Sequence, residues 1–425
     1  MAKFVLMDAY CASHVGNDVL LESSISIVKM IDRDAEITVH AKTKDAFESS
    51  QNMTCGRRLF ANPPAERLPK LMWILGELIF IAVQLINSVT FRIKPHHLAF
   101  GDRKQALRDY EEADVCISIG GEMISDTFWK ILPFYLHMYW LARQCGSKVV
   151  IFPQSIGPLK KNWTRKLVTR VLKNCDVVTG RDNPSMDELA SLGFTANQAI
   201  FSPDVGVGQP MSSPDEAKAY LEELGVDCDG DCQWIGITCS AGSPEPGIAR
   251  RDHIDILVEG LTAVAKKREI GVVILPANMP VNGTPPKDYN ASTKLYERIK
   301  PELSAILAPP AVIPARIFKA APERLDAFVS TRMHAAILST LSPTPTITLN
   351  TQRKLLGFMT LVGQEHFSLN LDALTPELLA ERIEEALDNS VHIRGSLQET
   401  RAERIAALDA YAERIAGILN IRSAT

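Results

Sequence analysis

The sequence predicts two doubly wound α/β domains, because two successive series of short apolar runs alternate with segments of helical period. The chain has 425 residues, more than one ordinary hydrophobic core accommodates. The runs are rich in β-branched residues and bounded by Gly, Pro or Asp, which is typical of buried parallel strands with crossover helices. A segment rich in Gly, Pro and Ser, at 206–214, separates the two series. We therefore expect one domain over residues 1–208 and a second over 209–395.

The first series contains five apolar runs, each expected to form a buried strand. In chain order they are KFVLMDAY, AEITVHA, VCISIGG, KVVIFPQ and DVVTGRD. Segments of helical period follow the first run and the last three, at residues 18–31, 129–145, 163–175 and 184–192. This alternation is the pattern of consecutive βαβ units in a parallel sheet.

The second series repeats the pattern, and a helix start at Pro214 and Asp215 opens it. Its expected strands are WIGITCSA, GVVILPA, DAFVSTR and TPTITLN. Its expected helices cover residues 254–267 and 292–300, and a third begins at Ala335. Residues 278–290 are too rich in Pro and Asn for regular structure, and they could equally form an active-site loop or a surface excursion. From Thr375 onward the sequence predicts two charged amphipathic helices, with a final helical segment over 396–425.

Composition and charge exclude several classes of protein. A formal charge of -4 offers no basic surface for phosphate backbones, so no nucleic-acid partner is expected. The eight cysteines are scattered, several within apolar runs, which indicates reduced thiols and a cytoplasmic location. Cys228 and Cys232 are close but lack a second ligand pair, so no metal is expected there. The first residues, MAKFVLMDAY, predict a strand rather than a secretion signal.

Residues 71–91, LMWILGELIFIAVQLINSVTF, are long and apolar enough to cross a bilayer, and Arg67 and Lys70 precede them. Glu77 and Gln84 argue against a membrane span, because a carboxylate near the middle of a span is costly. A span would also divide the first domain between its early and late strands. We expect a buried helix or one that seeks an interface, with peripheral membrane contact left open.

The residues that follow the apolar runs are the candidates for a site, because open parallel sheets bind ligands at the carboxyl ends of their strands. They are 241–243, His14, Gly16, Asn17, Gly120, Gly121, Glu122, Gln154, Ser155, Arg181, Asp204, Arg332, His334 and Lys354. Two adjacent glycines let a backbone approach a ligand closely, although they are also typical of tight turns. Arg181 could equally cap the carboxyl end of a helix, and His14 could be a turn residue.

Arg332 and His334 carry the strongest indication of a site, because burying two potential cations is costly unless an anion or fixed partners are present. With Arg181 they favour a compact dianion, or a phosphate and a carboxylate, since guanidinium groups bind both bidentately. The sequence contains neither a P-loop nor a GxGxxG motif, and it lacks GxSxG and a suitably placed Asp-x-Asp. An NTPase, a dinucleotide dehydrogenase, a serine hydrolase and a metal-dependent transferase are therefore not expected.

In these motifs the sequence resembles the polysaccharide pyruvyl transferase family, over about residues 5–370 and in the same order. The matching segments are HVGNDVLLESSI, ADVCISIGGEMISD, IFPQSIGPL, VVTGRDNPSMDEL, SPDVGV and DAFVSTRMHAAILSTLSPTPTITL, of which STRMHAA and PQSIGP are the most specific. Glu122 stands where many relatives carry a third glycine, and His14 where they commonly have Asn. Both departures bear on the acceptor rather than on the donor.

The resemblance implies a fold like that of GT-B glycosyltransferases, with two Rossmann-like domains facing across a cleft and the final helix, 396–425, returning to the first domain. It also implies an enzyme that takes pyruvate from phosphoenolpyruvate without a metal or other cofactor. The acceptor would be a sugar of a polysaccharide or of its lipid-linked precursor. With a lipid-linked acceptor the enzyme would work at the inner face of the membrane. The products would be a pyruvate ketal and free phosphate.

The resemblance also suggests roles for the candidate residues. His334 is expected as the general acid and base, and Arg332 and Arg181 as catalytic anchors for the carboxylate and phosphate of the donor. His14 and Asn17 are expected near the acceptor hydroxyls or the phosphate. The other expected substrate-binding residues are Gly16, Gly120, Gly121, Glu122, Gln154, Ser155, Asp204 and Lys354, with Lys354 as a further phosphate ligand.

Two other functions share this architecture, since a fold does not fix a function. One is a GT-B glycosyltransferase or nucleotide-sugar epimerase, which would use a nucleotide sugar. Such enzymes usually place a Glu or a His/Glu pair in the late helix of the second domain, where this chain has Arg-x-His. The other is a non-catalytic paralogue that binds glycans. The sequence leaves the acceptor sugar, its linkage positions and the oligomeric state open.

Overall fold

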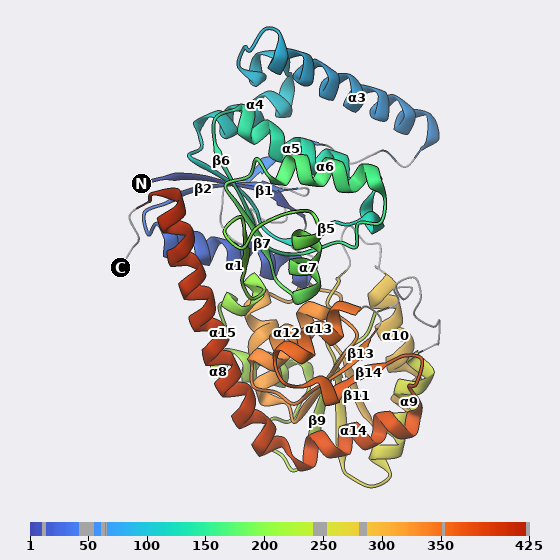
Figure 1. Cartoon of the computed structure of the whole chain (residues 1–425). Helices are drawn as coiled ribbons and strands as arrows, with labels where there is room; N and C mark the ends of the chain where they lie inside the picture. Colours follow the sequence, from blue (N-terminus) through green and yellow to red (C-terminus); the bar gives the residue numbers. More distant parts are fainter. Residues whose placement is uncertain are drawn as a thin grey trace. The chain divides into compact units, whose positions relative to one another are not determined.

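The computed structural model describes residues 1–10, 14–41, 55–60, 64, 66–240, 253–279, 287–350 and 353–421. The chain divides into two compact units (Figure 1). The N-terminal unit comprises Met1–Ala12, Leu20–Val205 and Ala407–Thr425, and the C-terminal unit comprises Ser13–Val19 and Gly206–Ala406. Along the chain the main boundary falls between Val205 and Gly206. Ser13–Val19 groups with the C-terminal unit, which its sequence position does not suggest.

The N-terminal unit is built on an eight-stranded parallel sheet in the order β3-β2-β1-β4-β6-β7-β8, with β5 paired to β6. Its strands are β1 Lys3–Ala9, β2 Glu36–Ala41, β3 Cys55–Arg57, β4 Val115–Ser118, β5 Gly121–Ile124, β6 Lys148–Ile156, β7 Val177–Gly180 and β8 Ala199–Phe201. The strand order reverses between β1 and β4, and ligands of doubly wound sheets bind at such a reversal.

The described helices of the N-terminal unit connect the strands of this sheet, and most of them pack an apolar face against it. They are α1 Val15–Ile31, which begins among residues of the other unit, α3 Arg67–Val89, α4 Gly101–Glu112, α5 Leu132–Gln144, α6 Asn162–Leu172 and α7 Asn183–Ser191, with short 3-10 turns at η1 Pro95–Leu98, η2 Asp126–Phe128 and η3 Val205–Gly208. The core contains Tyr110 of α4, Tyr139 of α5 and Val168 of α6 against Val5 and Cys116 of the sheet. These side chains are at most 2% exposed, and such burial is the main favourable term in folding.

The C-terminal unit has a six-stranded parallel sheet in the order β11-β10-β9-β12-β13-β14. Its strands are β9 Gln233–Thr238, β10 Ile270–Ile274, β11 Ser304–Leu307, β12 Ala327–Ser330, β13 Thr346–Asn350 and β14 Ser368–Asn370. Counted within the unit, this is the order 3-2-1-4-5-6 of a Rossmann sheet, which reverses between β9 and β12.

The helices of the C-terminal unit are α8 Pro214–Leu224, α9 His253–Ala265, α10 Lys287–Ile299, α11 Ala315–Ala320, α12 Met333–Leu341, α13 Arg353–Leu361, α14 Pro376–Asp388 and most of α15 Ser390–Leu419, with 3-10 turns at η4 Ala321–Arg324 and η5 Glu365–Phe367. In α8, identifiable residues determine where the helix begins and ends. Ser213 and Glu216 form a capping box at the start of α8, and Gly225, with φ of 100°, ends it.

The last helix, α15, is one continuous element of 30 residues. Its first half belongs to the C-terminal unit, where Arg394 donates hydrogen bonds to the carbonyl oxygens of Pro343 and Leu325. From Ala407 it belongs to the N-terminal unit, where the hydroxyls of Tyr411 and Thr179 lie 3.0 Å apart. The helix thus begins before the expected residue 396, and its end packs on the N-terminal unit.

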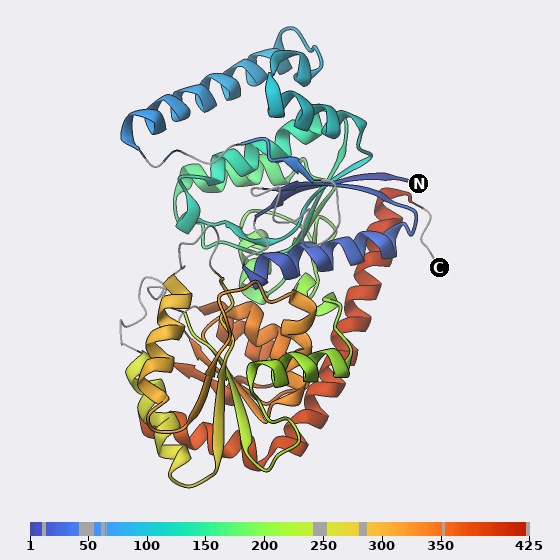
Figure 2. The ribbon, with the colours of Figure 1, turned by 180° about the vertical axis from the view of Figure 1, so that it is seen from behind.

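One sequence-based expectation was wrong. Gln154 and Ser155 do not follow their strand but lie within it, because β6 extends to Ile156. Of the two alternatives for residues 71–91, a buried helix does not fit, because α3 covers 67–89 and only 22% of its most apolar window is buried. Both views place α3 at the margin of the N-terminal unit, away from the sheet (Figures 1 and 2).

Candidate functional site

The C-terminal unit gathers predicted residues at the edge where its strand order reverses. Arg332 and His334 directly follow β12, the strand paired with β9 at the reversal. Arg332 is the N-cap of α12, but its side chain makes no capping hydrogen bond. Instead the hydroxyl of Ser330 donates to the Arg332 carbonyl at 2.8 Å and accepts from its N–H at 3.1 Å. Ser330 thus holds the turn, and the guanidinium is left to bind elsewhere.

His14 and Gly16 lie against His334, at the start of α1. His14 forms an isolated antiparallel bridge with Asn278, and its Nδ1 accepts the Gly16 N–H at 3.1 Å. A Cβ atom on Gly16 would lie 2.5 Å from Nδ1 of His334 and 3.2 Å from Cε1 of His14. Only glycine therefore fits at this position, because the two imidazoles approach its backbone so closely. Asn17, one residue further, donates its backbone N–H to the His14 carbonyl at 2.9 Å.

Arg332 forms an ion pair with Asp288, in the first turn of α10. The carboxylate of Asp288 is 3% exposed, whereas the arginine side chain is 28% exposed. The buried Nε of Arg332 has no hydrogen-bond partner among the residues that the structure describes. The pair orients a guanidinium that keeps donors for a second, anionic partner, since this group carries five N–H bonds.

Burial and the charges around His14 determine its protonation. Burial, together with the positive charges of Arg332 and Lys354 and against the opposing charge of Asp288, lowers the pKa of His14 from 6.5 to about 4. Lys354, the second residue of α13, is thus close enough to act on the same imidazole. The site is electropositive, and the His14 ring is neutral at pH 7.

The N-terminal unit has a second group of predicted residues, around the glycine pair. Gly120 and Gly121 have φ of 104° and 117°, and a Cβ on Gly120 would lie 2.8 Å from the Pro153 carbonyl oxygen. Gly121 pairs with Gln154 in the β5–β6 ladder. Gln154 is 1% exposed, and neither amide atom of its side chain has a hydrogen-bond partner in the described part of the chain. A buried amide without partners is costly, which makes Gln154 a candidate to bind a ligand.

Arg181 is held by fixed protein partners. Its Nε donates to the Ser155 hydroxyl at 3.0 Å, and its Nη1 pairs with Asp204 at 2.5 Å. The Ser155 hydroxyl in turn donates to Asp182 at 2.7 Å. The side chains of Arg181 and Asp204 are 1% and 4% exposed. These contacts hold the Arg181 guanidinium in place, and its role as a donor anchor stays a prediction.

Sequence reasoning missed Asp8, at the strand reversal of the N-terminal unit. Its carboxylate accepts hydrogen bonds from the Ser118 hydroxyl at 2.6 Å and the Ile119 N–H at 2.9 Å. Burial raises the pKa of Asp8, against these hydrogen bonds and the charge of Arg58. Its position at the end of the first apolar run was the signal that could have identified it.

The other predicted residues are placed as follows. Glu122 lies half-buried in β5, and residues 241–243 lie outside the described part of the chain. Asp288 and Asn278, which the sequence analysis did not single out, both lie within residues 278–290, which were predicted to be irregular, but Asp288 belongs to α10, which begins at Lys287. Among the described residues no group of three or more His, Cys, Asp or Glu could hold a metal ion.

Comparison with solved structures identifies the fold class, two parallel-sheet α/β domains of GT-B-like type. UDP-GlcNAc 2-epimerase from Neisseria meningitidis bound to UDP-GlcNAc is similar, with a TM-score of 0.58 and 11% identity over 98% of this chain and 99% of that one. HepE from Anabaena in complex with UDP and glucose is similar with a TM-score of 0.56 and 13% identity over 99% of this chain and 100% of that one. A glycosyltransferase from Rickettsia africae has a TM-score of 0.57 and 10% identity, again over 99% of this chain and 100% of that one. At these identities the likeness establishes the fold alone.

Within that class the chain belongs to the polysaccharide pyruvyl transferase family, whose sequence profile matches residues 14–353. The match begins at His14 and includes every predicted site residue except Lys354. No curated protein matches the sequence. Family membership indicates a transferase of polysaccharide biosynthesis.

Proposed function

We propose that the protein transfers pyruvate from phosphoenolpyruvate to two hydroxyls of a sugar, forming a ketal and releasing phosphate. The observation that carries this proposal is the cluster of Arg332, Lys354, His14 and His334 at the strand reversal of the C-terminal unit. Phosphoenolpyruvate is a small anion with a carboxylate and a phosphate, and guanidinium and ammonium groups bind both. The family assignment supports the same donor class.

The start of α12 adds to the attraction for an anion. His334 is the second residue of this helix and Arg332 is its N-cap. Backbone N–H groups and the positive end of the helix dipole favour negative charge at such a position. A donor phosphate or carboxylate bound there would lie beside the imidazole that we assign to proton transfer.

The reaction needs one proton moved to carbon, and we assign this step to His334. In the imidazolium form it protonates the methylene carbon of the enol, which leaves an electrophilic C2. The first sugar hydroxyl adds to C2 and returns its proton to the neutral imidazole. The C2–O bond to phosphate breaks, the second hydroxyl closes the ketal, and its proton leaves with the phosphate. An imidazole suits both transfers because its ordinary pKa lies near neutrality.

His14 has a different task in this scheme. Its Nδ1 already accepts the Gly16 N–H, and its pKa of about 4 keeps the ring neutral at pH 7. The remaining ring nitrogen then carries a hydrogen and donates it. We assign His14 to hold a phosphate or hydroxyl oxygen as a neutral donor, not to act as the base.

Ligand-dependent stability tests the donor. Phosphoenolpyruvate is expected to raise the melting temperature, because ligand at about 100 times Kd adds about 2.7 kcal/mol to the free energy of unfolding. UDP-sugars are expected to leave it unchanged. The reverse ranking would favour a nucleotide-sugar glycosyltransferase or epimerase. Binding of glycans with no phosphate release under any condition would favour the non-catalytic paralogue.

The variant His334→Ala tests the assignment of the proton transfer. We expect it to fold and to keep the stabilisation by phosphoenolpyruvate, because Arg332 and Lys354 remain. Phosphate release should fall by roughly 10²- to 10⁴-fold, the usual contribution of a general acid or base. Release at the wild-type rate would remove His334 from this role.

A further inference from the structure

Helix α3 is polar where it contacts the protein and apolar where it faces outward, the reverse of an ordinary surface helix. Its buried residues are Glu77, Phe80, Gln84 and Asn87. They recur at the spacing of one helix face, so three of the four buried side chains of α3 are polar. The opposite half of the helix therefore carries nearly all of its apolar side chains.

The polar face is fixed to the segment that follows the helix. Glu77 is ion-paired with Arg103 of α4, and Gln84 Nε2 donates to the Pro95 carbonyl at 3.1 Å. Asn87 both donates to the Ile93 carbonyl at 2.8 Å and accepts the Ile93 N–H at 3.1 Å. These bonds dock α3 along the N-terminal unit, so the helix cannot leave it to cross a bilayer without losing them.

The outward face is apolar and exposed along its whole length. Leu71, Met72, Leu75, Ile79, Ile86 and Val89 are 55–75% exposed. Between residues 71 and 91 the only charged residue is Glu77, which points inward. A contiguous apolar surface of this kind on a folded protein marks a binding surface for another apolar phase. By length and composition, helix α3 is also apolar enough to cross a membrane.

The charges at the two ends of the helix decide which partner fits. Arg67 and Lys70 lie exposed at its start, and Arg92 lies exposed just after its end. Two copies of α3 paired by a two-fold axis would bring cations close to cations at both ends. An anionic lipid surface instead neutralises all three, while its acyl region takes up the apolar face.

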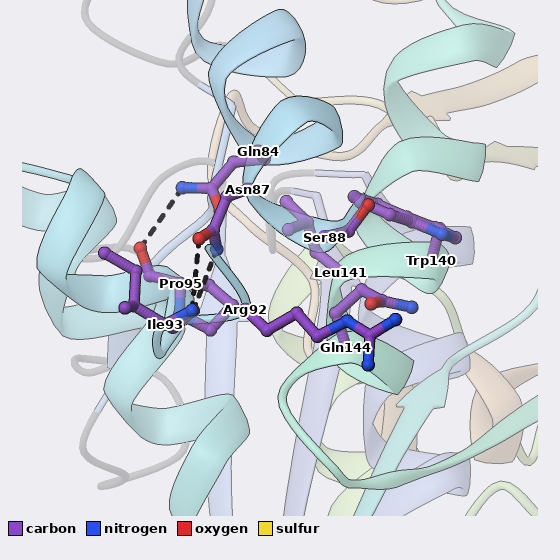
Figure 3. A pocket seen from close by; sticks show the side chains of 9 residues that line it. All are labelled: Gln84, Asn87, Ser88, Arg92, Ile93, Pro95, Trp140, Leu141 and Gln144. Carbon is purple, nitrogen blue, oxygen red and sulfur yellow. Dashed lines mark hydrogen bonds between the residues drawn. The ribbon is translucent and has the colours of Figure 1, made fainter. Parts of the chain in front are cut away.

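A cavity of about 340 Å³ lies at the C-terminal end of the inward, polar face of α3, with Arg92, Asn87, Trp140 and Gln144 among its lining residues (Figure 3). Arg92 has φ of 53°, a left-handed conformation in which Gly or Asn is usual. This residue follows the end of α3, where its backbone N–H donates to the Asn87 carbonyl at 2.7 Å. The guanidinium of Arg92 suits the phosphate of a lipid headgroup.

We propose that α3 lies in the plane of an anionic phospholipid membrane, with its apolar face among the acyl chains and Arg67, Lys70 and Arg92 at the headgroups. The N-terminal unit is thereby held at the membrane surface. This inference is independent of the proposed donor chemistry, because it concerns binding alone. With the proposed function, it favours a lipid-linked sugar as acceptor.

Flotation of the full chain with lipid vesicles tests the proposal. We expect binding to phosphatidylcholine vesicles that contain phosphatidylglycerol, and much weaker binding to phosphatidylcholine alone. The double variant Leu75→Glu/Ile79→Glu should reduce partitioning by on the order of tenfold or more, because it places charge in the apolar face. Val391→Glu is the matched control, since Val391 is 86% exposed on another helix, and it should bind like wild type.

The triple variant Arg67→Gln/Lys70→Gln/Arg92→Gln tests the charge argument. About 1 kcal/mol per cation corresponds to roughly fivefold each, so binding to the anionic vesicles should fall by roughly a hundredfold. Phosphoenolpyruvate should stabilise all of these variants as it stabilises wild type, which separates this test from that of the donor.

Several outcomes would overturn the proposal. They are an absence of wild-type binding to anionic vesicles, equal binding by the Leu75/Ile79 variant, and a homodimer in solution that the same variant dissociates without any vesicle binding. Retention of the native protein in natural membranes after alkaline carbonate extraction would also contradict it, because a helix that lies in the interface is released by that treatment while a spanning one is not.

Discussion

The imidazole of His334 packs directly against the backbone of Gly16, and this contact is the tightest steric constraint that we find in the site. The imidazole takes the space that any side chain at position 16 would need, since a Cβ there would lie 2.5 Å from Nδ1. The close approach fixes His334 relative to His14 and to the start of α1. Catalytic groups must be held within about 0.5 Å of their productive position, so under the proposed function this contact bears directly on the rate.

Gly16→Ala is therefore expected to lower kcat by roughly a hundredfold through displacement of His334. The KM for phosphoenolpyruvate should change less, because Arg332 and Lys354 are untouched. Gly395→Ala is the matched control, since a Cβ at Gly395 meets nothing within 4 Å. Steady-state kinetics of both variants check this, and an unimpaired Gly16→Ala enzyme would show that His334 need not occupy its observed position.

The sequence identified some of these residues and missed others for physical reasons. Arg332 and His334 stood out because cations directly after a buried strand are costly and need an explanation. Asp288 escaped notice because it lies within residues 278–290, which were expected to be irregular, and nothing local links it to Arg332 across 44 residues. Asp8 was hidden inside an apolar strand, where only the folded sheet brings Ser118 to its carboxylate.

Among the elements, α5 carries a buried histidine that makes the fold sensitive to acid. His137 stacks on Trp140 and contacts the rings of Phe60 and Phe80. Its Nε2 has no hydrogen-bond partner among the described residues. Burial lowers the pKa of His137 from 6.5 to about 4, so the folded state holds the ring neutral where the unfolded state would protonate it.

Stability should thus be full above pH 6.5 and fall as the pH drops from 6.5 to about 4, because the unfolded state binds more protons in this window. His14 contributes with the same sign. His137→Phe removes the contribution of His137 to this loss of stability. The free energy of unfolding of the variant relative to wild type should therefore rise by up to about 3 kcal/mol near pH 4. Denaturant unfolding at several pH values measures this, with His392→Phe on the exposed face of α15 as control. A constant difference between variant and wild type across the window would refute the explanation.

The long strands and helices were predictable, whereas the short strands were not. β4, β6, β9, β10, β12 and β13 coincide with β-branched runs, since a strand buried on both faces needs apolar residues throughout. β3, β8 and β14 have only three residues each, too few to show a period. The apolar length of α3 was evident, but its orientation was not, because the partners of Glu77 and Gln84 are known only from the fold.

At the scale of the whole chain, two Rossmann-type sheets follow one another in sequence, and the last helix, α15, contributes residues to both units. Its terminal part contributes Leu408, Tyr411, Ile415 and Leu419 to the N-terminal unit, all at most 3% exposed. The hydroxyl of Tyr411 meets that of Thr179, and its ring contacts Phe152 edge to face. The C-terminal end of the chain is thus part of the N-terminal core.

Tyr411→Ala should therefore destabilise the protein by about 3–5 kcal/mol, the usual cost of removing a buried aromatic ring. Val391→Ala, on the same helix but 86% exposed, should change stability by about 0.5 kcal/mol or less. Thermal or denaturant unfolding compares the two variants. Equal stabilities would mean that the end of α15 does not contribute to the core of the N-terminal unit.

The central claim is that the cationic site at β12 delivers pyruvate from phosphoenolpyruvate to a sugar. Incubation with phosphoenolpyruvate and a panel of free and lipid-linked glycans, followed by mass spectrometry, tests it most directly. We predict that one glycan gains the mass of a pyruvate less one water, with one phosphate released per product and none formed by His334→Ala. Unmodified glycans together with turnover of a UDP-sugar would contradict the claim.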